Sequence, residues 1–89
     1  MPSSYDWRRF GTVRDAVVTI IGDHYGLYGR ILPLDTDLMA DLDSDEIDRL
    51  EVLMTMEEVF DVRFDQAAQA GVRTVGDVLA LVEATLADQ

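Results

Sequence analysis

The sequence has 89 residues, 48% of them hydrophobic, with no cysteine and a formal net charge of −11. This length makes one domain with a single core, and the absence of thiols excludes disulfides, thiolate metal ligands and a cysteine nucleophile. The negative charge excludes nucleic acid as a partner, and no apolar run reaches the roughly 18 residues of a membrane span. Because the start also lacks a signal-peptide pattern, the chain is predicted to be a cytoplasmic protein.

The first helix is predicted over residues 13–25. Thr12 and Asp15 have the three-residue spacing of a capping box, and apolar residues follow at helical intervals. Gly26 then ends the pattern.

Residues 1–11 are predicted to be an N-terminal tail that precedes a helical domain of residues 12–89. Trp7 and Phe10 lie three residues apart in this tail. They either extend the apolar stripe of the first helix or, because Gly11 follows them, belong to a short separate piece.

A long loop is predicted over residues 26–43, where glycine and proline interrupt the helical pattern. Its apolar residues are too numerous to be fully exposed, so the loop must be pinned to the core. The second helix should run over residues 45–60, with Ser44 or Asp45 as its N-cap.

Apolar residues occupy two sides of this second helix. One side is Val52, Leu53, Met56, Val59 and Phe60. The other is Ile47, Leu50 and Met54, interleaved with Asp48, Glu51 and Glu58. In so small a domain, this pattern indicates that the first side forms the core and the second faces a partner.

A single short helix fits residues 65–70, before Gly71. Thr74 then caps a last helix with a clean apolar stripe. No segment alternates for long enough to predict a strand, so the fold is predicted to be an all-α bundle of three longer helices and one short one.

The acidic residues are concentrated in one part of the chain. Residues 35–61 contain eleven Asp and Glu but one basic residue, Arg49. Such a density of like charge costs stability, which suggests a basic partner. The alternative is a solvated acidic face that only keeps the protein in solution.

Three alternating aspartates, Asp41, Asp43 and Asp45, resemble the opening of a calcium-binding EF-hand loop. The sixth position of that loop should be glycine and is Glu46, and the twelfth should be glutamate and is Val52. We therefore expect no dedicated metal site, only weak cation binding at the three aspartates.

No catalytic constellation is evident, so we expect a non-enzymatic protein. The one histidine, His24, lies beside the apolar stripe of the first helix and is interpreted as a boundary residue. A small acid/base enzyme built on the carboxylate cluster is a remote alternative.

From Leu38 to Leu86 the chain resembles the acyl carrier proteins. The run DLDSDEIDRLEVLMTMEEVFDVRF is similar to the loop and second helix of that family, and VRTVGDVLALV is similar to the start of its last helix. With the first helix included, the resemblance covers about residues 12–87. It implies the acyl-carrier-type four-helix bundle.

The resemblance also implies a missing attachment point. The family opens its second helix with Asp-Ser-Leu, and that serine carries 4′-phosphopantetheine. The corresponding residues here are Asp45, Glu46 and Ile47, and a glycine usual two positions before the triplet is Asp43. Ser44 is a displaced alternative acceptor. A plainer interpretation is that Glu46 is only a favourable first-turn residue, since helix N-termini attract anions.

These features predict a degenerate carrier that acts as a monomer, without a cofactor. The family's partner-recognition helix implies docking to a basic surface on acyl-transferring or synthase enzymes of fatty acid, polyketide or related lipid metabolism. The residues that match that helix are Ile47, Leu50, Glu51, Met54 and Glu58. The alternative is an active carrier with 4′-phosphopantetheine on Ser44.

Overall fold

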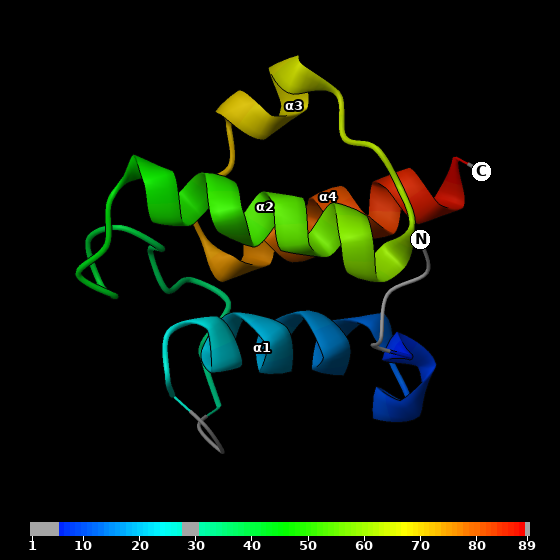
Figure 1. The fold of residues 1–89 in the computed structure, drawn as a ribbon, viewed down its shortest axis with the longest axis horizontal. Helices are drawn as coiled ribbons and strands as arrows, with labels where there is room; N and C mark the ends of the chain where they lie inside the picture. Colours follow the sequence, from blue (N-terminus) through cyan, green and yellow to red (C-terminus); the bar gives the residue numbers. More distant parts are fainter. Residues whose placement is uncertain (1–5, 28–30, 89) are drawn as a thin grey trace.

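The computed structural model describes residues 6–27 and 31–88 of the chain (Figure 1). A 3₁₀ helix, η1, comes first, and four α-helices follow. Their bounds are η1 Trp7–Phe10, α1 Val13–His24, α2 Glu46–Phe60, α3 Gln66–Ala70 and α4 Val75–Ala87. The predicted all-α bundle, with three longer helices and one short one, is confirmed.

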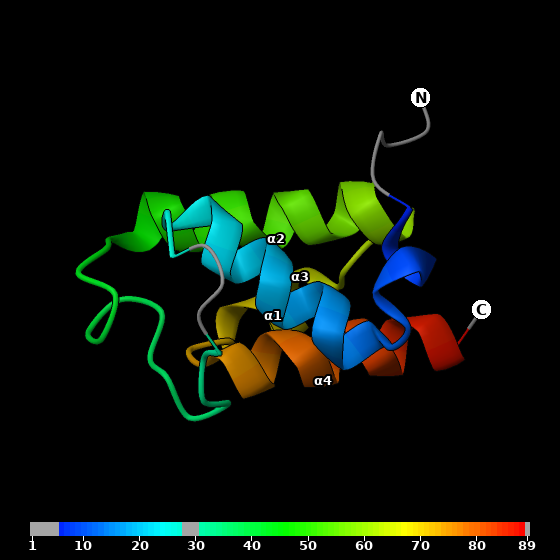
Figure 2. The same cartoon turned by 90° about the horizontal axis from the view of Figure 1, so that it is seen from below.

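The three longer helices pack side by side. In Figure 1, α1 runs from right to left, whereas α2 and α4 both run from left to right. Figure 2 shows α1 lying across the space between α2 and α4. The short α3 lies on the side of α2 away from α1, and none of its residues is buried.

The core fills the space between these three helices. Its fully buried large side chains come from all three helices and from the loop before α2. They are Val17, Ile21, Leu38, Val52, Leu53, Met56, Val75, Val78 and Val82. The face of α2 predicted to be in the core is therefore buried, as the apolar periodicity requires.

Each longer helix begins at a side-chain cap, which satisfies a backbone N–H that has no partner within the helix. The Thr12 hydroxyl accepts from the Asp15 amide at 3.0 Å, and Thr74 caps α4 in the same way. At α2, the cap is Asp45 rather than Ser44, with Asp48 as its reciprocal partner. The predicted boundaries of α1 and α2 are correct to within one residue, and Thr74 caps α4 as predicted.

Backbone hydrogen bonds fasten the loop before α2 to the start of α4. The Leu38 amide donates to the Arg73 carbonyl at 2.8 Å, and the Val75 amide donates to the Thr36 carbonyl at 3.0 Å. Next to them, the Leu34 carbonyl accepts from the Gly76 amide at 2.7 Å. A Cβ on Gly76 would lie 3.0 Å from that carbonyl oxygen, so this close approach needs glycine.

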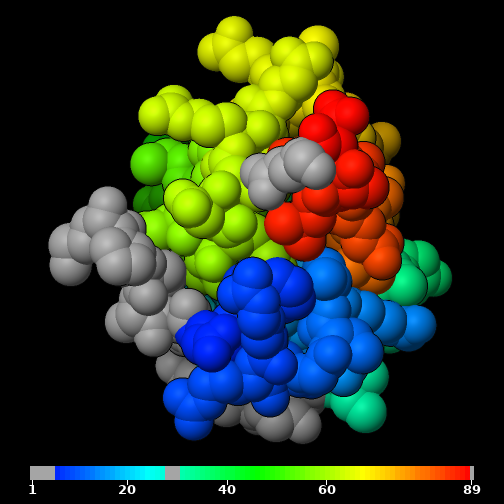
Figure 3. Space-filling model, turned by 90° about the vertical axis from the view of Figure 1, so that its right-hand side faces the viewer, coloured from blue at the N-terminus to red at the C-terminus, as the bar shows by residue number. Residues whose placement is uncertain are grey.

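The N-terminal segment is docked on the bundle through aromatic side chains. The rings of Trp7 and Phe60 are 5.1 Å apart at a tilt of 43°, and Arg8 lies over the indole at 4.7 Å. Gly11, with φ of 89°, separates η1 from α1. Figure 3 shows the dark blue η1 beside the blue start of α1. Trp7 and Phe10 thus form a short separate piece that packs on the core.

Among the described residues, no helix combines the length and the apolar character needed to cross a bilayer.

Phe60 should be the most informative residue for testing the two faces of α2. Phe60→Ala removes a buried ring that also contacts Trp7. We expect it to lower the free energy of unfolding by roughly 3 kcal/mol or more, measured by urea denaturation.

Ile47→Ala is the matched control, because Ile47 is 65% exposed on the same helix. Its cost should stay within about 0.5 kcal/mol. A larger loss for Ile47→Ala than for Phe60→Ala would show that the two faces have been exchanged.

Candidate functional site

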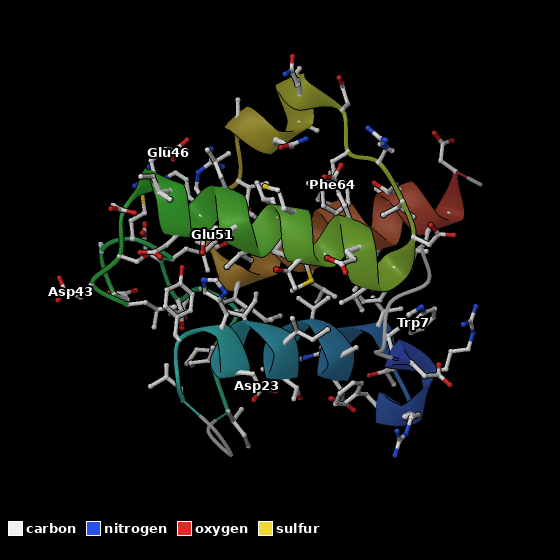
Figure 4. The ribbon with its side chains drawn as sticks, viewed as in Figure 1. Trp7, Asp23, Asp43, Glu46, Glu51 and Phe64 are labelled. Carbon is white, nitrogen blue, oxygen red and sulfur yellow. The ribbon has the colours of Figure 1, made fainter. Side chains whose placement is uncertain are left out.

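The turn that leads into α2 adopts a left-handed backbone conformation. Asp43 has φ of 51°, a region in which glycine is favoured and aspartate is tolerated. Figure 4 shows Asp43 at the outer edge of this loop. This conformation gives a physical reason for the glycine that the family usually has at this point, and for the tolerance of aspartate here.

The Ser44 hydroxyl already has two partners. It donates to the Leu38 carbonyl at 2.5 Å and lies 3.2 Å from the hydroxyl of Tyr25. The side chain is only partly exposed. Ser44 therefore ties the loop to the end of α1.

Glu46 begins α2 (Figure 4) and forms a bidentate ion pair with Arg49. Its two carboxylate oxygens accept from Nε and an Nη of Arg49, each at 2.7 Å. Such a two-point pair is among the stronger and more directional hydrogen-bonded contacts. The residue at the family's serine position is thus held by its own helix.

Arg49 links the start of α2 to the segment around α3. Its other terminal nitrogen donates to the carbonyls of Gln69 at 2.7 Å and Val72 at 3.1 Å. Arg49 is 7% exposed, and among the described residues no other charged residue is buried. Sequence reasoning missed this role, although Arg49 lies three and four residues before Val52 and Leu53 on the buried stripe.

The charges of this pair stabilise each other. Hydrogen bonding to Arg49 lowers the pKa of Glu46, and the same contact raises the pKa of Arg49. The Glu46 carboxylate therefore stays ionised to a lower pH than an unpaired glutamate does.

The second apolar face of α2 lies open to solvent. Ile47, Leu50 and Met54 are 65%, 40% and 66% exposed, respectively. Glu51 and Glu58 are exposed beside them. The structure thus brings all five predicted partner-binding residues together on one accessible helix surface.

The three aspartates expected to bind cations weakly are occupied with local backbone contacts or point outward. Asp41 accepts from the Asp37 amide at 2.7 Å, and Asp45 caps α2. Among the described residues, the one group whose ligand atoms converge is a different one: His24, Asp48 and Glu51. No sequence signal joins His24 to these carboxylates, because they meet only when α1 packs on α2.

No family model matches the chain. The sequence is, however, similar to named acyl carrier proteins over most of its length. It is 35% identical over 74 residues to that of Chlamydia trachomatis, covering 81% of this chain and 94% of the relative. It is 31% identical over 68 residues to that of Prochlorococcus marinus, covering 76% and 85%. The acyl carrier protein of Trieres chinensis is 32% identical over 68 residues.

The chain belongs to the acyl carrier protein family. The named relatives are carriers rather than enzymes. The helical bundle and the position of α2 within it also agree with this membership.

Arg49 should control how firmly the segment of residues 66–72 is held. Arg49→Met keeps an unbranched apolar side chain at this position but removes the ion pair with Glu46 and both hydrogen bonds to the carbonyls of Gln69 and Val72. Hydrogen bonds to charged groups contribute about 1.5–3 kcal/mol. We expect amide hydrogen exchange in this segment to become about ten-fold faster or more, with little change in α4, when followed by mass spectrometry.

Arg73→Met is the control, because Arg73 is exposed and makes only a 3.5 Å contact with Asp37. It should leave exchange at residues 66–72 unchanged. Equal exchange rates in wild type and Arg49→Met would contradict a role for Arg49 in holding this segment.

Proposed function

We propose that this protein is a degenerate acyl carrier protein that docks partner enzymes through α2 and carries no 4′-phosphopantetheine. The partners are acyl-transferring or synthase enzymes of fatty acid, polyketide or related lipid metabolism. The observation that carries the proposal is the bidentate pairing of Glu46, at the family's serine position, with the buried Arg49.

The residues at the start of α2 do not fit the prosthetic group. A serine hydroxyl attacks a phosphoanhydride of coenzyme A to leave a stable phosphodiester, whereas a carboxylate would form a mixed anhydride that hydrolyses readily. The Glu46 carboxylate is moreover engaged by Arg49 on both oxygens. The nearest hydroxyl, on Ser44, is hydrogen-bonded to the Leu38 carbonyl.

Docking uses the charge and the apolar side chains of α2 in succession. Residues 35–61 carry a net charge of −10. This charge attracts a basic surface over roughly one Debye length, about 8 Å at physiological salt. The exposed Ile47, Leu50 and Met54 are then covered by the partner, which removes apolar area from water.

A shallow groove extends this surface toward the C-terminal end of α2. Met54 lines it together with Leu81 and Ala84 of α4, and acidic residues Glu58 and Asp61 lie at its side. An apolar floor beside carboxylates suits an apolar side chain flanked by basic residues.

The first test of this proposal is attachment of the prosthetic group. Incubation with coenzyme A and a broad-specificity phosphopantetheinyl transferase should leave the intact mass unchanged, because Glu46 offers no hydroxyl. A mass gain that disappears in Ser44→Ala would instead establish an active carrier that uses Ser44.

Glu46→Ser is the positive control, since it restores the family triplet as Asp-Ser-Ile at residues 45–47. If the surrounding loop is still recognised by the transferase, this variant gains the mass of phosphopantetheine. Ser44→Ala in the same background should not affect that gain.

The second test concerns the docking surface and uses a partner captured from the native host. Glu51→Lys and Glu58→Lys should slow association and reduce its dependence on salt, because charge controls the encounter rate. Leu50→Ala and Met54→Ala should mainly speed dissociation, costing on the order of 1–2 kcal/mol each, measured by surface plasmon resonance.

Two exposed residues outside α2 serve as matched controls. Glu83→Lys reverses a charge on α4, and Ile31→Ala truncates a side chain that is 92% exposed on the loop. Both should leave the two rates nearly unchanged. Partner binding that ignores all four α2 variants but responds to these controls would move the docking site off α2.

A further inference from the structure

His24, the last residue of α1, faces two carboxylates on the first half of α2. Its Nε2 lies 3.9 Å from a carboxylate oxygen of Glu51. One ligand atom from each of His24, Asp48 and Glu51 lies within 4.8 Å of the other two. Figure 1 shows the cyan end of α1 beside this half of α2. Two separate helices therefore bring an imidazole and two carboxylates to one point.

The spacing of these atoms is close to that of a metal site. Three points within 4.8 Å of one another always leave a position about 2.8 Å or less from each of them. Zinc binds imidazole nitrogen and carboxylate oxygen at about 2.0–2.2 Å. Each ligand atom would therefore have to move by less than about 1 Å, which a small side-chain rotation can provide; the His24 and Glu51 side chains are 22% and 55% exposed.

Two of the three ligands are held in place by neighbours. One oxygen of Asp48 accepts from the Asp45 amide at 3.3 Å in the capping box, which orients its carboxylate. The ring of His24 lies edge-on to Tyr25 at 4.9 Å, and the Tyr25 hydroxyl is hydrogen-bonded to Ser44. Such supporting contacts are what orient ligands in metal sites.

We propose that His24, Asp48 and Glu51 bind one Zn²⁺ ion between α1 and α2. An imidazole nitrogen favours zinc over Ca²⁺ and Mg²⁺, which prefer oxygen ligands alone. Three protein ligands leave a coordination position for water. This site is distinct from the weak cation binding expected at Asp41, Asp43 and Asp45.

The ion would also regulate docking, an inference that rests on the proposed function. Glu51 is one of the carboxylates expected to attract a partner. Coordination would occupy this carboxylate and add two positive charges to the acidic face of α2. Zinc would thus slow the association of a basic partner.

The test is a calorimetric titration of the full chain with Zn²⁺ in a millimolar excess of Mg²⁺, which saturates indiscriminate carboxylate binding. We expect one zinc ion per chain. His24→Ala should weaken binding by about ten-fold or more, and Glu51→Gln should weaken it likewise. Glu83→Gln is the matched control, because Glu83 is an exposed acid of α4 outside the cluster, and it should bind zinc as the wild type does.

The proposal is overturned if Mg²⁺ abolishes zinc binding, or if His24→Ala binds zinc as tightly as the wild type. Glu51→Gln keeps the test decisive if His24→Ala is destabilised, because Glu51 is on the surface. Slower partner association in zinc supports the regulatory step, and unchanged association overturns it. If Glu51→Lys has no effect on association without zinc, the proposed docking function fails while the metal site stands.

Discussion

The arrangement at the start of α2 depends on one buried guanidinium. Arg49 holds Glu46 with one edge and the carbonyls of Gln69 and Val72 with the other. A buried charge is costly unless it is paired and its donors are satisfied, and here both conditions are met. The segment around α3 contributes no buried residue of its own from that helix. Its position therefore relies on the buried Phe64 and Val72 on either side of the helix and on the hydrogen bonds from Arg49.

Glu46 and Arg49 are consequently interdependent. Without the carboxylate, water would have to take its place on the Nε edge of a guanidinium that is otherwise buried. Without the arginine, Glu46 would be an ordinary exposed acid at a helix N-terminus. The pairing gives Glu46 a structural task in addition to its favourable first-turn position. Through Arg49, Glu46 also helps to fasten α2 to the segment around α3.

The helices could be predicted from the sequence because their signals are local. A cap such as Thr12 or Thr74 bonds to a backbone amide three residues along the chain. The apolar stripe from Val52 to Phe60 likewise repeats within a few helical turns. The exposed face of Ile47, Leu50 and Met54 followed from the same periodicity. Contacts between distant segments carried no such signal. The packing of Trp7 on Phe60 and the approach of His24 to Glu51 require the helices to be placed first.

Arg49 lies between these two cases, because its position on the apolar stripe was visible but its partners were not. A charged residue at a core position of a helix is a local conflict, and conflicts of this kind are expected where a protein departs from the ordinary form of its fold. Here the conflict coincides with the departure from the family triplet, three residues away at Glu46. Restoring a serine at residue 46 would therefore leave the Arg49 guanidinium without its carboxylate.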